Sequence, residues 1–96
     1  MNVEINPSEY KVLIVDDVIS NVLLLKVLLN NEKFQIVTAS NGTEALAQVK
    51  NEKPDLVLLD VMMPDISGFD VAKQMKADPG MCRIRYLRKK QRRIFL

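Results

Sequence analysis

Three aspartates follow apolar segments of the chain, at positions from which their carboxylates could act together. Asp16 and Asp17 come directly after the mostly apolar segment Lys11–Val15, and Asp60 comes directly after Leu56–Leu59. Carboxylates that are brought close together repel each other, so either their pKa values rise or a hard cation binds among them. The chain has no histidine and a single cysteine, which removes the usual ligands of zinc. Magnesium is therefore the expected cation.

Magnesium held by carboxylates commonly joins them to a phosphate oxygen, so such a cluster indicates phosphate chemistry. An aspartate oxygen can form an acyl phosphate when a cation neutralises the developing charge and the donor is held in line. A single aspartate at a strand end is about as often a solvated or helix-capping residue as a functional one. Three aspartates at coordinated positions disfavour the solvated or capping interpretation. Hydrolysis by an aspartate nucleophile is disfavoured too, because such hydrolases usually carry a second acid two residues later, where this chain has Met62.

Strand-like and helix-like patterns alternate three times along the chain. The expected strands are 11–15, 34–39 and 56–59, and the expected helices are 21–31, one ending at 50, and one ending before 78–80. Ser20, Asn41 and Ser67 are predicted to cap the three helices. This alternation predicts a parallel sheet with helices on both faces. The three aspartates then lie beyond the carboxyl ends of the strands, at the switch point where such sheets bind ligands.

Two apolar segments also predict burial. Leucines and valines between residues 22 and 29 cover so wide a face that most of the first helix is expected to be buried. The unbroken run Leu56–Leu59 is typical of a strand that is covered on both faces. Both segments therefore predict a sheet enclosed between two helical layers.

The motifs around the aspartates resemble those of the response-regulator receiver domain of two-component signalling. The matching segments are Val15-Asp16-Asp17, Asn41-Gly42-x-Glu44-Ala45-Leu46 and Leu58-Leu59-Asp60-Val61-Met62-Met63-Pro64-Asp65-Ile66-Ser67-Gly68. The resemblance runs from about Tyr10 to Met81. It implies an α/β fold with a flavodoxin-like, doubly wound parallel sheet, of which the first three βα units are recognisable in the strand order 2-1-3.

The resemblance also implies a role for each matching residue. Asp60 would be the phosphoacceptor, Asp17 a direct ligand of Mg²⁺, and Asp16 an acidic partner that acts through water. Asp60 and the backbone carbonyl of Met62 would be further ligands of the metal. The implied phosphodonor is a phosphohistidine on a sensor histidine kinase. The implied function is that of a signalling phosphoacceptor rather than an enzyme, although such a domain can catalyse its own phosphorylation and dephosphorylation.

The resemblance ends where the composition changes. Residues 1–81 carry seven lysines and twelve acidic residues, a net charge of −5, whereas residues 82–96 carry five arginines, two lysines and no acid, a net charge of +7. The family fold has five strands, with a Ser or Thr ending the fourth and a Lys ending the fifth, and neither residue can be placed here. We therefore predict a partial receiver domain at 1–81, with the fourth and fifth units missing or replaced by a basic tail at 82–96, and impaired output switching.

A chain that stopped at the third unit would leave the apolar strand Leu56–Leu59 at a sheet edge, which invites pairing. The tail could supply a strand around Ile84–Leu87, two chains could pair, or the chain could be poorly stable; a homodimer through this edge is the favoured expectation. A frameshift is the expected origin of the tail, because one permitted set of codons for 82–96, read in a shifted frame, encodes Val-Ser-Ala followed by an acidic helix start.

The tail also supports an alternative function. Its seven cations could bind nucleic acid or another acidic surface, but Tyr86 and Phe95 are its only aromatic residues and no readout motif accompanies them. Solvated charge is the commoner explanation of such a run. The chain has no apolar run of about 18 to 20 residues and no signal-peptide pattern at its start, so a cytoplasmic location without membrane contact is expected.

Overall fold

The computed structural model describes residues 6–60, 63 and 65–89, with the backbone alone at 88 and 89. Its strands are β1 (Lys11–Val15), β2 (Gln35–Ala39), β3 (Leu56–Asp60) and β4 (Arg85–Lys89), and its helices are the 3-10 turn η1 (Pro7–Glu9), α1 (Ile19–Asn31), α2 (Gly42–Glu52) and α3 (Gly68–Ala77). The strands form one sheet in the order β2-β1-β3-β4, and every pair is parallel. The predicted parallel α/β sheet and its 2-1-3 order are therefore confirmed.

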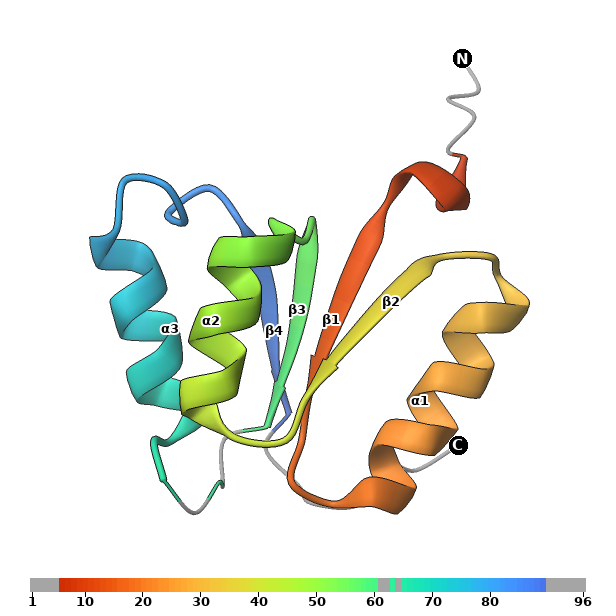
Figure 1. The fold of residues 1–96 in the computed structure, drawn as a ribbon, viewed down its shortest axis with the longest axis horizontal. Coiled ribbons are helices and arrows are strands. Elements are labelled where there is room, and N and C mark those ends of the chain that lie inside the picture. Colours follow the sequence, from red (N-terminus) through yellow and green to blue (C-terminus); the bar gives the residue numbers. More distant parts are fainter. Residues whose placement is uncertain (1–5, 61–62, 64, 90–96) are drawn as a thin grey trace.

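The helices lie on both faces of the sheet, with α2 and α3 on one side and α1 on the other (Figure 1). Two of the predicted helix caps are confirmed. The Asn41 side chain accepts a hydrogen bond of 2.8 Å from the backbone N–H of Glu44, and the Ser67 hydroxyl accepts one of 3.2 Å from that of Asp70. No helix in the described part of the chain is long and apolar enough to cross a membrane.

The hydrophobic core lies between the sheet and the α2–α3 layer. Alternate residues of a strand point to opposite faces, so every second side chain of β1 and β3 enters this core. The fully buried members from these strands are Leu13, Val15, Val57 and Leu59, and they pack with Val49 of α2 and Val71 and Met75 of α3. The core therefore holds the carboxyl ends of β1 and β3 at a fixed separation.

Replacing Leu13 by alanine is expected to lower the free energy of unfolding by about 2 to 5 kcal/mol, because this fully buried side chain would leave a cavity in the core. Urea unfolding followed by circular dichroism measures the loss. Leu87→Ala is the matched control, since that leucine is 61% exposed on β4. Equal losses in the two variants would contradict the assignment of the core.

Helix α1 differs from its prediction at its start and in its burial. It begins at Ile19 after Val18, which makes no side-chain capping bond, so the prediction that Ser20 caps the helix is wrong. The prediction of extensive burial is also wrong, because Leu23 is 56% exposed and Val27 is 59% exposed. The reason is that α1 packs mainly on β1 and β2, and its outer face, which carries Leu23 and Val27, is exposed in the described part of the chain.

Strand β4 changes the expected sheet edge. The basic segment supplies this strand, and it pairs with β3 from Leu56 opposite Arg85 to Asp60 opposite Lys89. The expectation that β3 would be an exposed edge is therefore wrong, and the homodimer predicted through that edge loses its premise. A tail strand near Ile84–Leu87 was one of three expected outcomes, and it is confirmed with a start one residue later.

The expectation that β3 is covered on both faces holds for one face only. Val57 and Leu59 are fully buried, whereas Leu56 and Leu58 on the α1 side are partly exposed, because α1 does not extend over β3. Residues 90–96 lie outside the described residues. Binding of nucleic acid through the basic tail, and the division of the chain at residue 81, accordingly stay predictions.

Candidate functional site

Three carboxylates converge at the carboxyl ends of β1 and β3. We call Asp16, Asp17 and Asp60 the acidic cluster: one oxygen of each can be chosen so that all lie within 4.8 Å of one another. The two strands are neighbours, with Val15 opposite Leu59, so the residues that follow them emerge side by side. The predicted convergence at the switch point of the sheet is therefore observed.

Asp16 is fixed by the turn that leads into α1. It is 2% exposed, and its carboxylate accepts hydrogen bonds from the backbone N–H of Val18 at 2.9 Å and from Nδ2 of Asn21 at 3.2 Å. Its own backbone N–H donates to the carbonyl of Ala39 at 3.1 Å, which ties the cluster to the end of β2. Asp16 therefore both belongs to the acidic cluster and holds the local backbone.

Asn21 belongs to the site, although no sequence motif predicted it. It is the one buried residue of α1, because its side-chain amide donates a hydrogen bond to Asp16 beneath the helix. The available signal was a single amide five residues after Asp16, within an otherwise mostly apolar stretch of helix. The position of α1 is thus linked to the acidic cluster by a polar contact rather than by apolar packing.

Asp60 and Asp17 differ in their exposure. Asp60 is the last residue of β3 and is 1% exposed, whereas Asp17 is half-buried and opens the cluster to solvent. Burying carboxylates is costly unless charge or hydrogen bonds compensate them. Met62 lies outside the described residues, so the carbonyl ligand implied for it stays a prediction.

The acidic cluster fits a hard divalent cation. Octahedral Mg²⁺ has ligand oxygens at about 2.0 to 2.1 Å, which places adjacent ligand oxygens about 2.9 Å apart and opposite ones about 4.2 Å apart. Oxygens within 4.8 Å of one another need only small side-chain adjustments to reach this geometry. The donor set is made of oxygen alone, which favours Mg²⁺ over softer metals. Asp16, Asp17 and Asp60 could therefore hold the metal.

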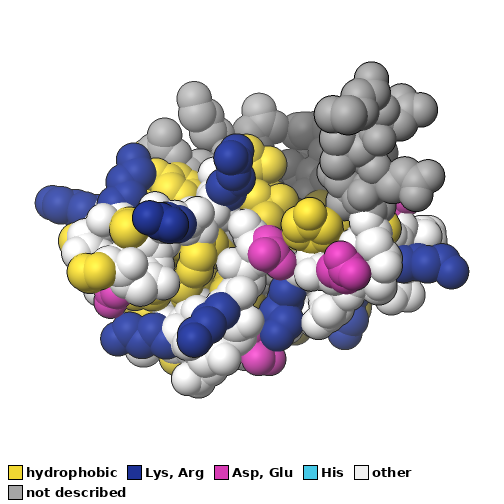
Figure 2. Space-filling model, turned by 90° about the horizontal axis from the view of Figure 1, so that it is seen from above, with side chains coloured by type: hydrophobic (Ala, Val, Ile, Leu, Met, Phe, Trp, Pro, Cys, Tyr) yellow, Lys and Arg dark blue, Asp and Glu magenta, His cyan; other side chains and the backbone are white. Residues whose placement is uncertain are grey.

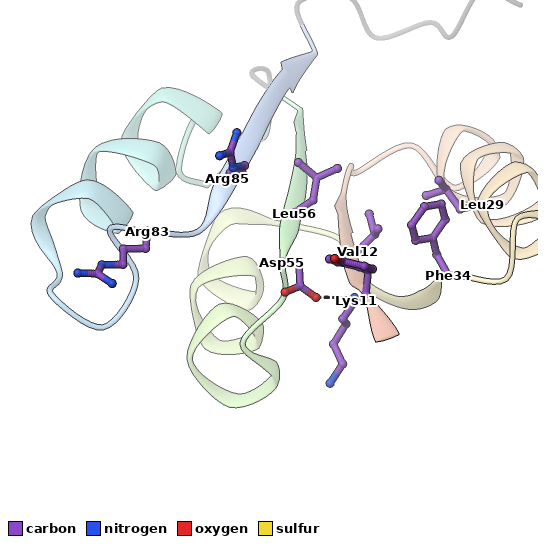
Figure 3. A pocket seen from close by; sticks show the side chains of 9 residues that line it. Lys11, Val12, Leu29, Phe34, Asp55, Leu56, Arg83 and Arg85 are labelled. Atoms are coloured by element: carbon purple, nitrogen blue, oxygen red, sulfur yellow. Dashed lines mark hydrogen bonds between the residues drawn. The ribbon is translucent and has the colours of Figure 1, made fainter. Parts of the chain in front are cut away.

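A larger hollow than the one beside the acidic cluster lies at the other end of the sheet. A cavity of about 530 Å³ opens at the amino ends of the strands, where Lys11, Leu56 and Arg85 begin β1, β3 and β4 (Figure 3). The view onto that end shows hydrophobic side chains exposed between lysine and arginine side chains (Figure 2). A smaller hollow of about 180 Å³ adjoins Asp16 and is lined by Ile19 and Glu44 among others. The candidate functional site is therefore identified by its carboxylates and not by the size of the adjoining hollow.

Asp65 anchors the segment after β3 to the start of α2. Its carboxylate accepts hydrogen bonds from the backbone N–H of Gly42 at 2.9 Å and of Thr43 at 3.0 Å, and from the Thr43 hydroxyl at 2.8 Å. These backbone donors are among those that an α-helix leaves without a partner in its first turn. The bonds from Gly42, Ile66 and Thr43 stabilise the charged form and hold the pKa of Asp65 well below its ordinary value of 3.8.

The stabilising contribution of Asp65 is expected to decline in acid. Because the pKa is lower in the folded chain, the unfolded chain binds more protons in this range. The contribution is therefore complete above about pH 5 and is lost as the pH falls toward the folded pKa. Urea unfolding of the wild type and Asp65→Asn between about pH 7 and pH 2.5 measures it. The difference in free energy of unfolding should narrow in acid, and a constant difference would contradict the prediction.

Comparison with known proteins places the chain among signalling proteins. The sequence profile described as response regulator receiver domain matches residues 12–92. The alkaline phosphatase synthesis transcriptional regulatory protein PhoP of Bacillus subtilis is 47% identical over 66 residues, which are 69% of this chain and 28% of PhoP. The chain spans only 15 to 32% of the length of the curated relatives that it matches.

Two solved structures share the fold. The phosphorylated cyanobacterial phytochrome response regulator RcpA superposes with a TM-score of 0.75 at 30% identity, over 82% of this chain and 63% of that one. A chain of the CheX–CheY–BeF₃–Mg²⁺ complex of Borrelia burgdorferi superposes with a TM-score of 0.68 at 35% identity, over 71% of this chain and 53% of that one. Both chains are therefore similar to this one in sequence as well as in fold.

Proposed function

Because the chain belongs to the response regulator receiver domain family of two-component signalling, we propose that Asp60 accepts a phosphoryl group in an Mg²⁺-dependent reaction. Receiver domains are signalling domains, and the donor proposed here is a phosphohistidine on a sensor histidine kinase, with this chain acting in the cytoplasm. The observation that carries the proposal is the burial of Asp60 beside two further carboxylates, with oxygens of all three within 4.8 Å of one another.

The proposed transfer uses an oxygen of the Asp60 carboxylate as the nucleophile. The new bond joins this oxygen to phosphorus, while the bond between phosphorus and the imidazole nitrogen of the donor breaks. The imidazole leaves with the electron pair of that bond and takes up a proton from solvent. Asp60 is held for attack because β3 ends at this residue, and the packed core beneath it keeps the strand end in place.

The other carboxylates of the cluster would hold the metal. We propose Asp17, which is half-buried, as a direct ligand together with Asp60 and the carbonyl of Met62. Asp16 would act through a water molecule, because its two oxygens already accept hydrogen bonds from Val18 and Asn21. Mg²⁺ bound here would neutralise charge on the transferring phosphoryl oxygens. The Mg²⁺ and BeF₃ named for the CheX–CheY complex, and the phosphorylation named for RcpA, support this assignment.

We propose that the response to phosphorylation is impaired in this chain. The family pattern requires a Ser or Thr at the end of the fourth strand, and β4 contains neither, since its sequence is RYLRK. The strand instead ends at Lys89, opposite Asp60. Phosphorylation of Asp60 would then lack the hydroxyl through which the family senses it.

Phosphorylation by a small phosphodonor tests the proposal without requiring the kinase. The folded chain is incubated with acetyl phosphate or phosphoramidate and Mg²⁺, and its intact mass is measured. We expect one phosphoryl adduct that maps to Asp60 and is absent without Mg²⁺. Absence of any adduct on demonstrably folded protein would contradict the proposal.

A further inference from the structure

We propose that Asp65 is a positioning residue for the acidic cluster. By fastening the segment after Asp60 to the start of α2, it sets the affinity of the cluster for Mg²⁺ although it is not one of the proposed ligands. The inference rests on the function proposed above and extends it to a residue outside the cluster.

The contacts of Asp65 join two parts of the chain that are far apart in sequence. Its carboxylate receives three hydrogen bonds from the first two residues of α2, which precede it by 23 and 22 positions. Asn41 already caps the same helix by bonding the backbone N–H of Glu44. Asp65 therefore satisfies a different pair of backbone donors, and α2 is capped both by its own preceding residue and by the loop after β3.

The backbone of the loop lies directly against the helix. Gly42 is buried, and a Cβ atom added to it would lie 2.7 Å from Cβ of Ile66 and 2.8 Å from the Ile66 carbonyl oxygen. Both distances are too short for any larger residue to be accepted without movement of Ile66. The hydrogen bonds of Asp65 therefore reinforce the close contact between Gly42 and Ile66.

The same short segment is tied to the acidic cluster at its other end. The carbonyl of Ala39, the last residue of β2, accepts the backbone N–H of Asp16, and α2 begins three residues later at Gly42. Gly42 is bonded to Asp65, and Asp65 is five residues from Asp60. Residues 39–43 thus bridge the strand end that carries Asp16 and the loop that leaves Asp60. Loosening one end of the bridge changes how firmly the two acids are held together.

Two simpler roles of Asp65 predict different results. If it acted only as a helix cap, its loss would destabilise the fold but leave Mg²⁺ affinity unchanged. If it acted only as a nearby negative charge, Asp65→Asn and Asp65→Ala would weaken Mg²⁺ binding equally. A positioning role predicts a graded loss, because asparagine keeps one acceptor oxygen for α2 and alanine keeps none.

The experiment measures Mg²⁺ binding by isothermal titration calorimetry, with the folded fraction of each variant established by circular dichroism. We expect Asp65→Ala to raise the dissociation constant by about tenfold to a hundredfold, the usual cost of losing a residue that orients metal ligands, and Asp65→Asn to raise it less. Asp78→Asn is the control, since the half-buried carboxylate of Asp78 accepts a hydrogen bond from the backbone N–H of Gly80 beyond α3, and the substitution removes the same charge. It should leave the affinity unchanged.

Gly42→Ala provides a test without a change of charge. The added methyl group pushes against Ile66, so the affinity for Mg²⁺ should fall in this variant as well. Equal Mg²⁺ affinities in the wild type and Asp65→Ala would overturn the inference and leave the proposed function intact. The same holds if the two Asp65 variants lose Mg²⁺ affinity equally while Gly42→Ala loses none. Failure of the wild-type chain to bind Mg²⁺ would overturn both.

Discussion

Asp60→Asn is expected to abolish phosphorylation of the chain by a small phosphodonor in the presence of Mg²⁺. The substitution replaces the nucleophilic carboxylate by a neutral amide, which cannot form the acyl phosphate and which contributes less to holding a cation. Asparagine has nearly the same shape, so the packing of this 1% exposed side chain is kept. Intact mass spectrometry of the two proteins under identical conditions measures the loss, which should be complete.

The Asp78→Asn variant is a matched control for this loss. It makes the same chemical change at a half-buried residue just beyond the end of α3, 18 positions after Asp60 in the chain. It should be phosphorylated like the wild type. An adduct that persists in Asp60→Asn, for example on Asp17, would show that another carboxylate is the acceptor and would contradict the assignment of Asp60.

Asp17→Asn is expected to remove Mg²⁺ binding almost entirely. The variant lacks the negative oxygen at the solvent-facing side of the cluster, and Mg²⁺ depends strongly on charged ligands because it gives up its water reluctantly. The dissociation constant should rise by more than about a hundredfold, beyond the usual cost of losing an orienting residue. Isothermal titration calorimetry measures the affinity, and phosphorylation should fall in parallel.

Asp16→Asn separates metal binding from local structure. Asp16 bonds Asn21 and the turn before α1, so its substitution should lower the free energy of unfolding by about 1 to 3 kcal/mol, the usual cost of a buried polar group without its partner. Asp17→Asn should leave the free energy of unfolding nearly unchanged. If Asp17→Asn binds Mg²⁺ like the wild type while Asp16→Asn does not, the roles proposed for the two residues are reversed.

The acidic cluster could be predicted because short segments of the sequence specify each strand and its direction. Each apolar run that ends on an aspartate specifies a strand and the end at which its carboxylate emerges, and parallel pairing then brings these ends together. The caps at Asn41 and Ser67 could be predicted for the same reason, since the capping residue and its partner are three positions apart. The receiver-like motifs named the same residues, and the structure brings Asp16, Asp17 and Asp60 together.

Helix α1 shows where local pattern is insufficient. Its leucines and valines indicated burial, but burial depends on which other elements cover them, and among the described elements α1 packs mainly on β1 and β2. The basic segment shows the converse. Arginine and lysine indicated a solvated tail, yet the open edge of β3 offers backbone partners, and pairing there satisfies the backbone groups of Arg85–Lys89 whatever their side chains.

The sequence by itself thus determined the three acids and their placement at strand ends, because these depend on local periodicity and on general rules of chain connection. The order of the first three strands was implied by the receiver-like motifs. The tertiary structure alone decided that Asn21 supports Asp16, that β4 covers the edge of β3, and that Asp65 bonds the start of α2. These contacts join residues that no local pattern relates, or whose pairing depends on which donors and strand edges the folded backbone leaves available.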